Sequence, residues 1–119
     1  MLNASCHCGN IQLTIPKPES LTSCNCSICH RLAALWGNYP PQDVSLNIAQ
    51  GGTEIYSHGD EYIHFHRCRK CGCTTHYTLT EKAGREKTAV NFRMVDPAAA
   101  QDIKVRRFDG ADTWTFIDE

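Results

Sequence analysis

Cysteine is the residue type that most limits what this chain can fold into. The eight cysteines fall into three tight groups along the sequence: Cys6 and Cys8; Cys24, Cys26 and Cys29; and Cys68, Cys71 and Cys73. Scattered use as a small buried residue would not produce such grouping. In a chain of 119 residues, cross-links built from these groups can supply a large share of the stability.

Metal ligation explains the cysteine groups better than a disulfide framework does. The segment 1–5 has neither a basic stretch nor an apolar run, so we expect no signal peptide and a cytoplasmic protein. A reducing compartment disfavours stable disulfides. No apolar run approaches the roughly 18 residues of a membrane span, and the formal net charge of −1 favours neither nucleic acid nor membrane partners.

Short alternating segments broken by turn residues predict a mainly β fold, a sandwich or barrel, with the whole chain as one domain. We expect strands over the segments 11–15, 44–48, 62–66, 88–95 and 103–108. Asp96 followed by Pro97 predicts the start of a short helix, because aspartate is a good N-cap and proline suits the first helical position. A second short helix or turn is expected over 29–35.

The motif CxxCG at Cys68 and Cys71 is typical of zinc ribbons and knuckles, because two intervening residues let a tight turn aim both sulfurs at one tetrahedral ion. The motif CxCG at Cys6 and Cys8 can supply the other half of a four-thiolate site. Such a site is closed, so we expect it to hold the fold together.

The middle group, CxCxxC, places Cys24, Cys26 and Cys29 where one loop can wrap all three around a single ion. Three protein ligands leave a fourth position open, which is typical of a catalytic zinc. Three thiolates make the zinc a weak Lewis acid but a good partner for a soft thiol. The residues alone therefore favour thiol chemistry over hydrolysis, although eight thiols can be divided between two sites in several ways.

These three motifs, in this order, resemble the glutathione-dependent formaldehyde-activating family, also called the centromere protein V/GFA domain. Further similar stretches are His30-Arg31, Phe65, the segment 90–96, Asp109-Gly110 and Trp114. The resemblance spans nearly the whole chain, so it implies one domain over residues 1–119 with the family's tent-like fold of short antiparallel sheets around zinc sites and one or two short helices.

The resemblance also implies how the cysteines divide between two zinc ions per chain. Cys6, Cys8, Cys68 and Cys71 would hold a structural zinc, and Cys24, Cys26 and Cys29 a zinc in the active pocket. The family's reaction joins formaldehyde to glutathione and is classed as a carbon–sulfur lyase reaction. We therefore expect a zinc-dependent lyase that acts on a small thiol, with a non-catalytic zinc-binding module as the alternative and a redox-sensing thiol cluster as a third possibility.

Several other residues could belong to the site. Arg31 and Arg93 are candidates to bind the carboxylates of a glutathione-like thiol, with a solvated charge or support of the zinc sites as the equal alternative. Cys73 could complete the pocket site, although an ordinary strand thiol is favoured. His64 and His66 are expected to face solvent, and His76 to be a polar strand residue.

Overall fold

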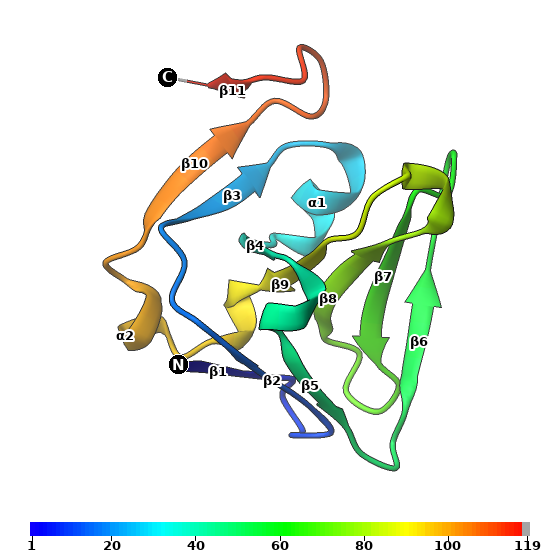
Figure 1. Cartoon of the computed structure of the whole chain (residues 1–119), viewed down its shortest axis with the longest axis vertical. Coiled ribbons are helices and arrows are strands. Elements are labelled where there is room, and N and C mark those ends of the chain that lie inside the picture. Colours follow the sequence, from blue (N-terminus) through cyan, green and yellow to red (C-terminus); the bar gives the residue numbers. More distant parts are fainter. Residues whose placement is uncertain (118–119) are drawn as a thin grey trace.

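The computed structural model describes residues 1–117, which form two β sheets and two short α helices (Figure 1). The smaller sheet is antiparallel and has the order β1-β2-β5. Its strands are β1 (Leu2–Ser5), β2 (Ile11–Ile15) and β5 (Ser45–Ile48). Ile11, Leu13 and Ile15 are buried while the residues between them are not, so the alternation predicted a strand correctly.

The larger sheet has the strand order β11-β10-β3-β4-β9-β8-β7-β6. Its strands are β3 (Ser20–Cys24), β4 (Trp36–Tyr39), β6 (Thr53–Tyr56), β7 (Ile63–Cys68), β8 (Thr74–Leu79), β9 (Thr88–Asn91), β10 (Lys104–Phe108) and β11 (Phe116–Ile117). All pairs are antiparallel except β10 with β3, which run parallel. The prediction of a mainly β fold is confirmed, with this one parallel pair as a difference.

Two arms of the larger sheet face each other across helix α1 (Ser27–Leu32). One arm consists of β3, β10 and β11, the other of β6, β7 and β8 (Figure 1). Strand β9 is shorter than predicted, since a 3-10 helix (Phe92–Met94) follows it. Two further 3-10 helices cover Pro41–Asp43 and Glu81–Ala83.

The second helix, α2 (Pro97–Ala100), begins as the sequence predicted. The Asp96 side chain accepts a hydrogen bond from Ala98 N at 3.0 Å, and Pro97 occupies the first helical position. Helix α1 starts earlier than expected, at Ser27, because Cys26 is its N-cap and Cys26 Sγ accepts a hydrogen bond from Cys29 N. Among residues 1–117, no helix combines the length and the apolar character needed to span a membrane.

Two apolar clusters make up the core, and each one includes cysteines. The first joins the small sheet to the large one and contains Cys6 and Cys68 together with Ile11, Leu13, Val90 and Phe92. The second lies beneath α1 and contains Cys29, Trp36, Phe65, Tyr77 and Ala89. Each group of thiols therefore lies at the border of its own core cluster, where apolar packing fixes the directions of the side chains.

Candidate metal centres and the adjoining cavity

Four cysteines from two distant segments converge on one point. Cys6 and Cys8 lie in the turn after β1, Cys68 ends β7, and Cys71 follows in the turn toward β8. Their sulfurs all lie within 4.8 Å of one another, with Cys6 to Cys8 at 3.8 Å and Cys8 to Cys68 at 3.6 Å. Tetrahedral zinc with Zn–S bonds of about 2.3 Å requires sulfurs roughly 3.8 Å apart. The spacing therefore fits a tetrahedral metal ion.

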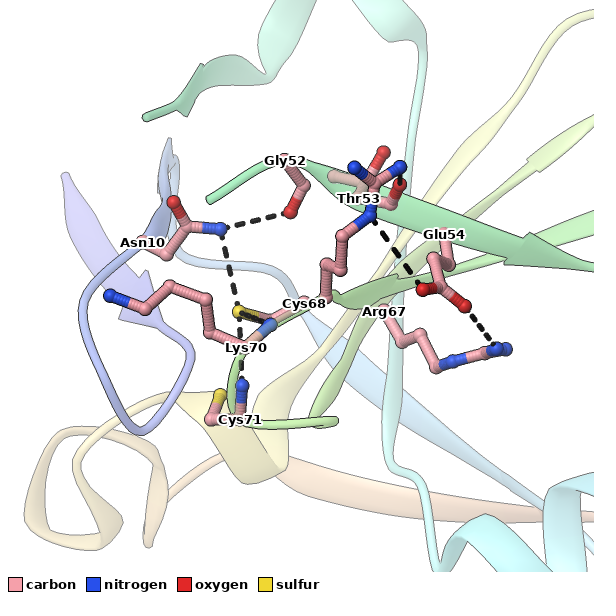
Figure 2. A network of polar contacts seen from close by, with 9 residues as sticks. Asn10, Gly52, Thr53, Glu54, Arg67, Cys68, Lys70 and Cys71 are labelled. Carbon is pink, nitrogen blue, oxygen red and sulfur yellow. Dashed lines mark hydrogen bonds and ion pairs between the residues drawn. The ribbon is translucent and has the colours of Figure 1, made fainter. Parts of the chain in front are cut away.

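Amide groups surround these sulfurs and offset the negative charge of thiolates. Lys70 N and Cys71 N donate to Cys68 Sγ at 3.3 and 3.4 Å, and Ile11 N donates to Cys6 Sγ at 3.2 Å. The buried Asn10 adds a side-chain donor, because its Nδ2 lies 3.4 Å from Cys68 Sγ and 2.9 Å from Gly52 O (Figure 2). Asn10 thus links the first cysteine turn to the second, a role that sequence reasoning missed.

The arginines nearest to this cluster form ion pairs with a carboxylate. Arg67 Nη2 lies 2.7 Å from Glu54 Oε2 (Figure 2). Arg69 Nε lies 3.6 Å from Glu54 Oε1. Both pairs are solvent-exposed, so their contribution to stability is small. Compensation at this cluster comes from the amides.

Cys73 lies beside the four-cysteine cluster and not beside the other one. Its sulfur accepts a hydrogen bond from His7 N, which favours the thiolate, but burial and the neighbouring Cys71 raise the pKa of Cys73 above its ordinary value. It packs against the first core cluster and, within residues 1–117, is absent from both groups of converging ligands. Cys73 is therefore a partly buried thiol as expected, but it lies in the turn just before β8 and not in a strand.

The second cluster consists of Cys24, Cys26 and Cys29, whose sulfurs also lie within 4.8 Å of one another. Cys24 ends β3, Cys26 caps α1, and Cys29 lies within the helix. A hydrogen bond from the Cys29 thiol lowers the pKa of Cys24 to about 5, and the same bond, together with burial, raises the pKa of Cys29. One thiol of the cluster is therefore readily ionised, as a metal ligand must be.

Other groups hold the second cluster in place. Trp36 Nε1 donates to Cys29 Sγ at 3.3 Å, and Trp36 is itself 2% exposed. Gly110, in the loop after β10, approaches so closely that a Cβ at this position would lie 2.6 Å from Cys24 Sγ. Asp109 holds that loop, because its carboxylate accepts from Asn25 Nδ2 at 3.1 Å and from Thr113 Oγ1 at 2.9 Å. The glycine is therefore needed for close approach and not for a positive φ.

A cavity of about 1020 Å³ opens beside this second cluster, between the two arms of the large sheet. All three of its cysteines line the cavity, whereas the members of the four-cysteine cluster do not. Trp114 is 70% exposed and packs edge-on against Phe108 at 5.2 Å, so it forms part of the rim. The exposed wall is more apolar than polar, and the large aromatic and aliphatic side chains that line it include Trp36, Phe65, Tyr77, Ile63, Leu79, Phe108, Trp114 and Phe116.

The two arginines predicted to bind substrate lie outside this cavity lining. Arg31 Nη1 donates to Ser27 O at 2.9 Å, and Arg93 Nε donates to Ala33 O at 2.9 Å, so each guanidinium contacts a carbonyl of the α1 region. Sequence reasoning missed the cations that do line the cavity, because their approach to the second cluster depends on how the arms face each other. These cations come from the connection between β8 and β9 and are Lys82, Arg85 and Lys87.

The histidines of β7 and β8 differ from expectation. His76 is 2% exposed, because β8 is an inner strand between β7 and β9, and its ring stacks on His66 at 4.3 Å. His66 is half-buried and lies 2.8 Å from Thr78 Oγ1, and His64 is also half-buried, so neither faces solvent freely. None of the three lines the cavity.

Fold and clusters define a class of protein: a mainly β protein with two cysteine clusters that could each hold a metal ion, one of them beside a cavity. The family model described as "Glutathione-dependent formaldehyde-activating enzyme" matches residues 1–109, and the chain belongs to this family.

Two similar proteins give further support. A Halomonas elongata protein named "Putative glutathione-dependent formaldehyde-activating enzyme" is 29% identical over 77 residues, which cover 63% of this chain and 45% of that relative. The match thus spans less than half the length of this curated relative. The crystal structure of a Rhodobacter sphaeroides protein has a TM-score of 0.70 and 22% identity over 87% of this chain and 99% of that one. That likeness shows a shared fold.

Proposed function

We propose that this chain is a zinc-dependent enzyme of the carbon–sulfur lyase type, with residues 1–119 forming one domain. It would activate a small thiol such as glutathione for addition to an aldehyde such as formaldehyde, or for release of the aldehyde from the adduct. The observation that carries the proposal is that Cys24, Cys26 and Cys29 line a cavity of about 1020 Å³. That volume suits a tripeptide-sized ligand.

We assign the structural zinc to Cys6, Cys8, Cys68 and Cys71, and a second zinc to Cys24, Cys26 and Cys29. The donor sets fit this metal, because thiolate sulfur suits zinc and four converging sulfurs leave no room for substrate, whereas three do. Zinc held by these three thiolates would supply a soft Lewis acid that lowers the pKa of a bound thiol.

The residues of the chain hold this site rigid and partly dry. Trp36 and the amide of Gly110 hydrogen-bond to the sulfurs of Cys29 and Cys24, so the three thiolates keep their directions. Trp36, Phe65 and Tyr77 pack against one another, with the Trp36 and Tyr77 rings 4.7 Å apart, and form an apolar floor next to the sulfurs. A substrate thiolate held there would lose part of its hydration shell, which strengthens its attraction to the site.

Glutathione titration tests this proposal. Wild-type protein and the variant Cys26→Ser would each be analysed for zinc and titrated calorimetrically with glutathione. Serine is chosen because its side-chain oxygen can still cap α1. We expect two zinc ions per chain in the wild type, one in the variant, and glutathione binding only in the wild type. Exchange spectroscopy with labelled formaldehyde then measures whether the wild type accelerates formation of S-(hydroxymethyl)glutathione.

Two results would contradict the proposal. Equal glutathione binding by both proteins would show that the three-cysteine cluster takes no part in binding the thiol. Binding without any acceleration of adduct exchange would favour the alternative, a non-catalytic zinc-binding module.

A further inference from the structure

The cations of the cavity are concentrated on one segment of its wall. Lys82, Arg85 and Lys87 all belong to the connection between β8 and β9 and all line the cavity. Asp60 is a carboxylate that also lines it, in the loop between β6 and β7. The cavity wall therefore carries more positive than negative charge, on the side formed by this connection.

Lys87 differs from the other two cations in its surroundings. It is half-buried, whereas Lys82 and Arg85 are exposed. Its Nζ donates to Tyr77 Oη at 2.7 Å and lies 4.9 Å from the centre of the Tyr77 ring. Tyr77 is 8% exposed and is fixed by edge contacts with Trp36 and Phe65. The ammonium group is thus held at a defined place in the wall by a rigid aromatic side chain.

This half-buried ammonium has no anionic partner within residues 1–117. Lys82, in the same connection, pairs with Glu61 at 3.5 Å, but none of the ion pairs described for the chain includes Lys87. Burial, and after it the nearby Arg85, lower the pKa of Lys87, and the smaller opposing effect of Cys29 does not offset them. A charged group in this state gains most from a ligand that brings a carboxylate.

We propose that Lys87, held by Tyr77 and assisted by Arg85, binds a carboxylate of the substrate thiol and so selects anionic thiols over neutral ones. This inference rests on the proposed function, because it assigns a wall residue that would hold the substrate whose sulfur reaches the Cys24–Cys26–Cys29 cluster. Lys87 acts as a specificity-determining residue: it holds a carboxylate of the thiol and leaves the sulfur free to reach the cluster.

The test compares two thiols that differ in charge but share the same peptide, glutathione and its diethyl ester, titrated into zinc-loaded protein. In the wild type we expect glutathione to bind about 10- to 100-fold more tightly than the ester. Lys87→Met keeps the length of the side chain and removes the charge, and should abolish most of that preference. Lys87→Arg should restore part of it, and Tyr77→Phe should reduce it by about 2- to 5-fold.

Lys82→Met is the matched control, because Lys82 lines the same cavity but is exposed and paired with Glu61. It should change the preference by less than about 2-fold. Zinc content and the unfolding transition, measured for every variant, show whether both sites and the fold are retained. In the exchange assay, loss of Lys87 should raise the KM for glutathione and leave kcat within a few-fold, since the residue holds substrate and not the reacting atoms.

Three results separate the two proposals. If the wild type binds glutathione and Lys87→Met keeps the same preference over the ester, this inference is overturned and the proposed function stands. If Lys87→Met and Lys82→Met lose the preference equally, a diffuse positive field and not Lys87 selects the ligand, which also overturns it. If the wild type binds neither thiol, the proposed function fails and this inference fails with it.

Discussion

The two cysteine clusters of this chain differ in how many separate parts of the fold they join. The four-cysteine cluster connects the turn after β1 with the turn after β7, and Asn10 and its partners extend this link to the segment 51–52. The three-cysteine cluster comes from the end of β3 and the first turn of α1, with the loop around Gly110 packed against it from a distant part of the sequence. A cross-link between distant segments constrains the unfolded chain far more than a local one.

The two cysteine clusters also differ in their surroundings. In the four-cysteine cluster, Cys6 and Cys68 belong to the apolar core, Cys71 packs against it and Cys8 is exposed, and none of the four lines the large cavity. All three cysteines of the other cluster line that cavity. The two clusters therefore suit different roles. The four-cysteine cluster joins several chain segments, which favours stability, and the three-cysteine cluster faces a cavity, which favours binding. If this comparison holds, damage to the first cluster should unfold the protein and damage to the second should leave it folded.

The largest effect is expected from Cys68→Ser compared with Cys26→Ser. Cys68 Sγ receives three N–H donors and joins two segments, so we expect its loss to reduce the free energy of unfolding by more than about 4 kcal/mol, or to prevent folding. Cys26→Ser should cost less than about 2 kcal/mol. Denaturant unfolding with zinc content measured in parallel provides the comparison.

Graded chelation of the wild type gives the same answer without a variant. The zinc beside the cavity should leave first with the fold intact, and loss of the zinc at the four-cysteine cluster should coincide with unfolding. Simultaneous loss of both ions, or unfolding as soon as the first one leaves, would break the division into a stabilising and a binding cluster.

A matched pair of asparagines should show the next largest difference. Asn10 is buried and makes hydrogen bonds to Gly52 O, Gly51 N and Cys68 Sγ. Asn25 is exposed and bonds to Asp109 Oδ1 and Ala111 N. Asn10→Ala should reduce the free energy of unfolding by about 2–3 kcal/mol, because buried partners lose their hydrogen bonds. Asn25→Ala should reduce it by less than about 1 kcal/mol, because water replaces the lost hydrogen bonds. If thermal or denaturant unfolding shows equal losses of stability for the two variants, burial does not decide how much these asparagines contribute.

The sequence predicted features that depend on local spacing. Cysteine spacing indicated the turns around Cys6 and Cys68, and Asp96 and Pro97 indicated the start of α2. The cationic wall at Lys87 was not predictable, because it forms only where two arms of the sheet face each other across α1. Alternation in β7 and β8 also gave no warning that both faces of β8 are covered, so the burial of His76 was missed.

Buried His76 should make the large sheet next to the first cluster sensitive to acid. Burial, and after it His66, lower the pKa of His76 to about 3, so the folded state excludes a proton that the unfolded state binds below about pH 6.5. Stability from this residue is complete above pH 6.5 and is lost as the pH falls toward 3. Between about pH 7.5 and 5.5, His76 should lower the free energy of unfolding by about 1.4 kcal/mol.

His76→Gln isolates this effect, since glutamine keeps a polar group of similar reach toward Thr75 without titrating. The quantity to compare is the pH dependence of the free energy of unfolding, with zinc content held equal, and not the absolute stability. A variant with the same slope as the wild type would show that His76 does not contribute to the acid sensitivity and that other titrating groups cause it.

The smallest effect on folding, and the sharpest on the second cluster, is expected from Gly110→Ala. A Cβ at this position would lie 2.6 Å from Cys24 Sγ, and a single side-chain sulfur can rotate away. The free energy of unfolding should therefore fall by less than about 1 kcal/mol. A rotated sulfur no longer points toward Cys26 and Cys29, so zinc at this cluster should bind at least about 10-fold more weakly, as for other losses of support around a metal. The four-cysteine cluster of the same chain is the internal control and should keep one zinc ion. Loss of zinc from both clusters, or from neither, would show that zinc binding at the three-cysteine cluster does not depend on the space that Gly110 leaves for the Cys24 sulfur.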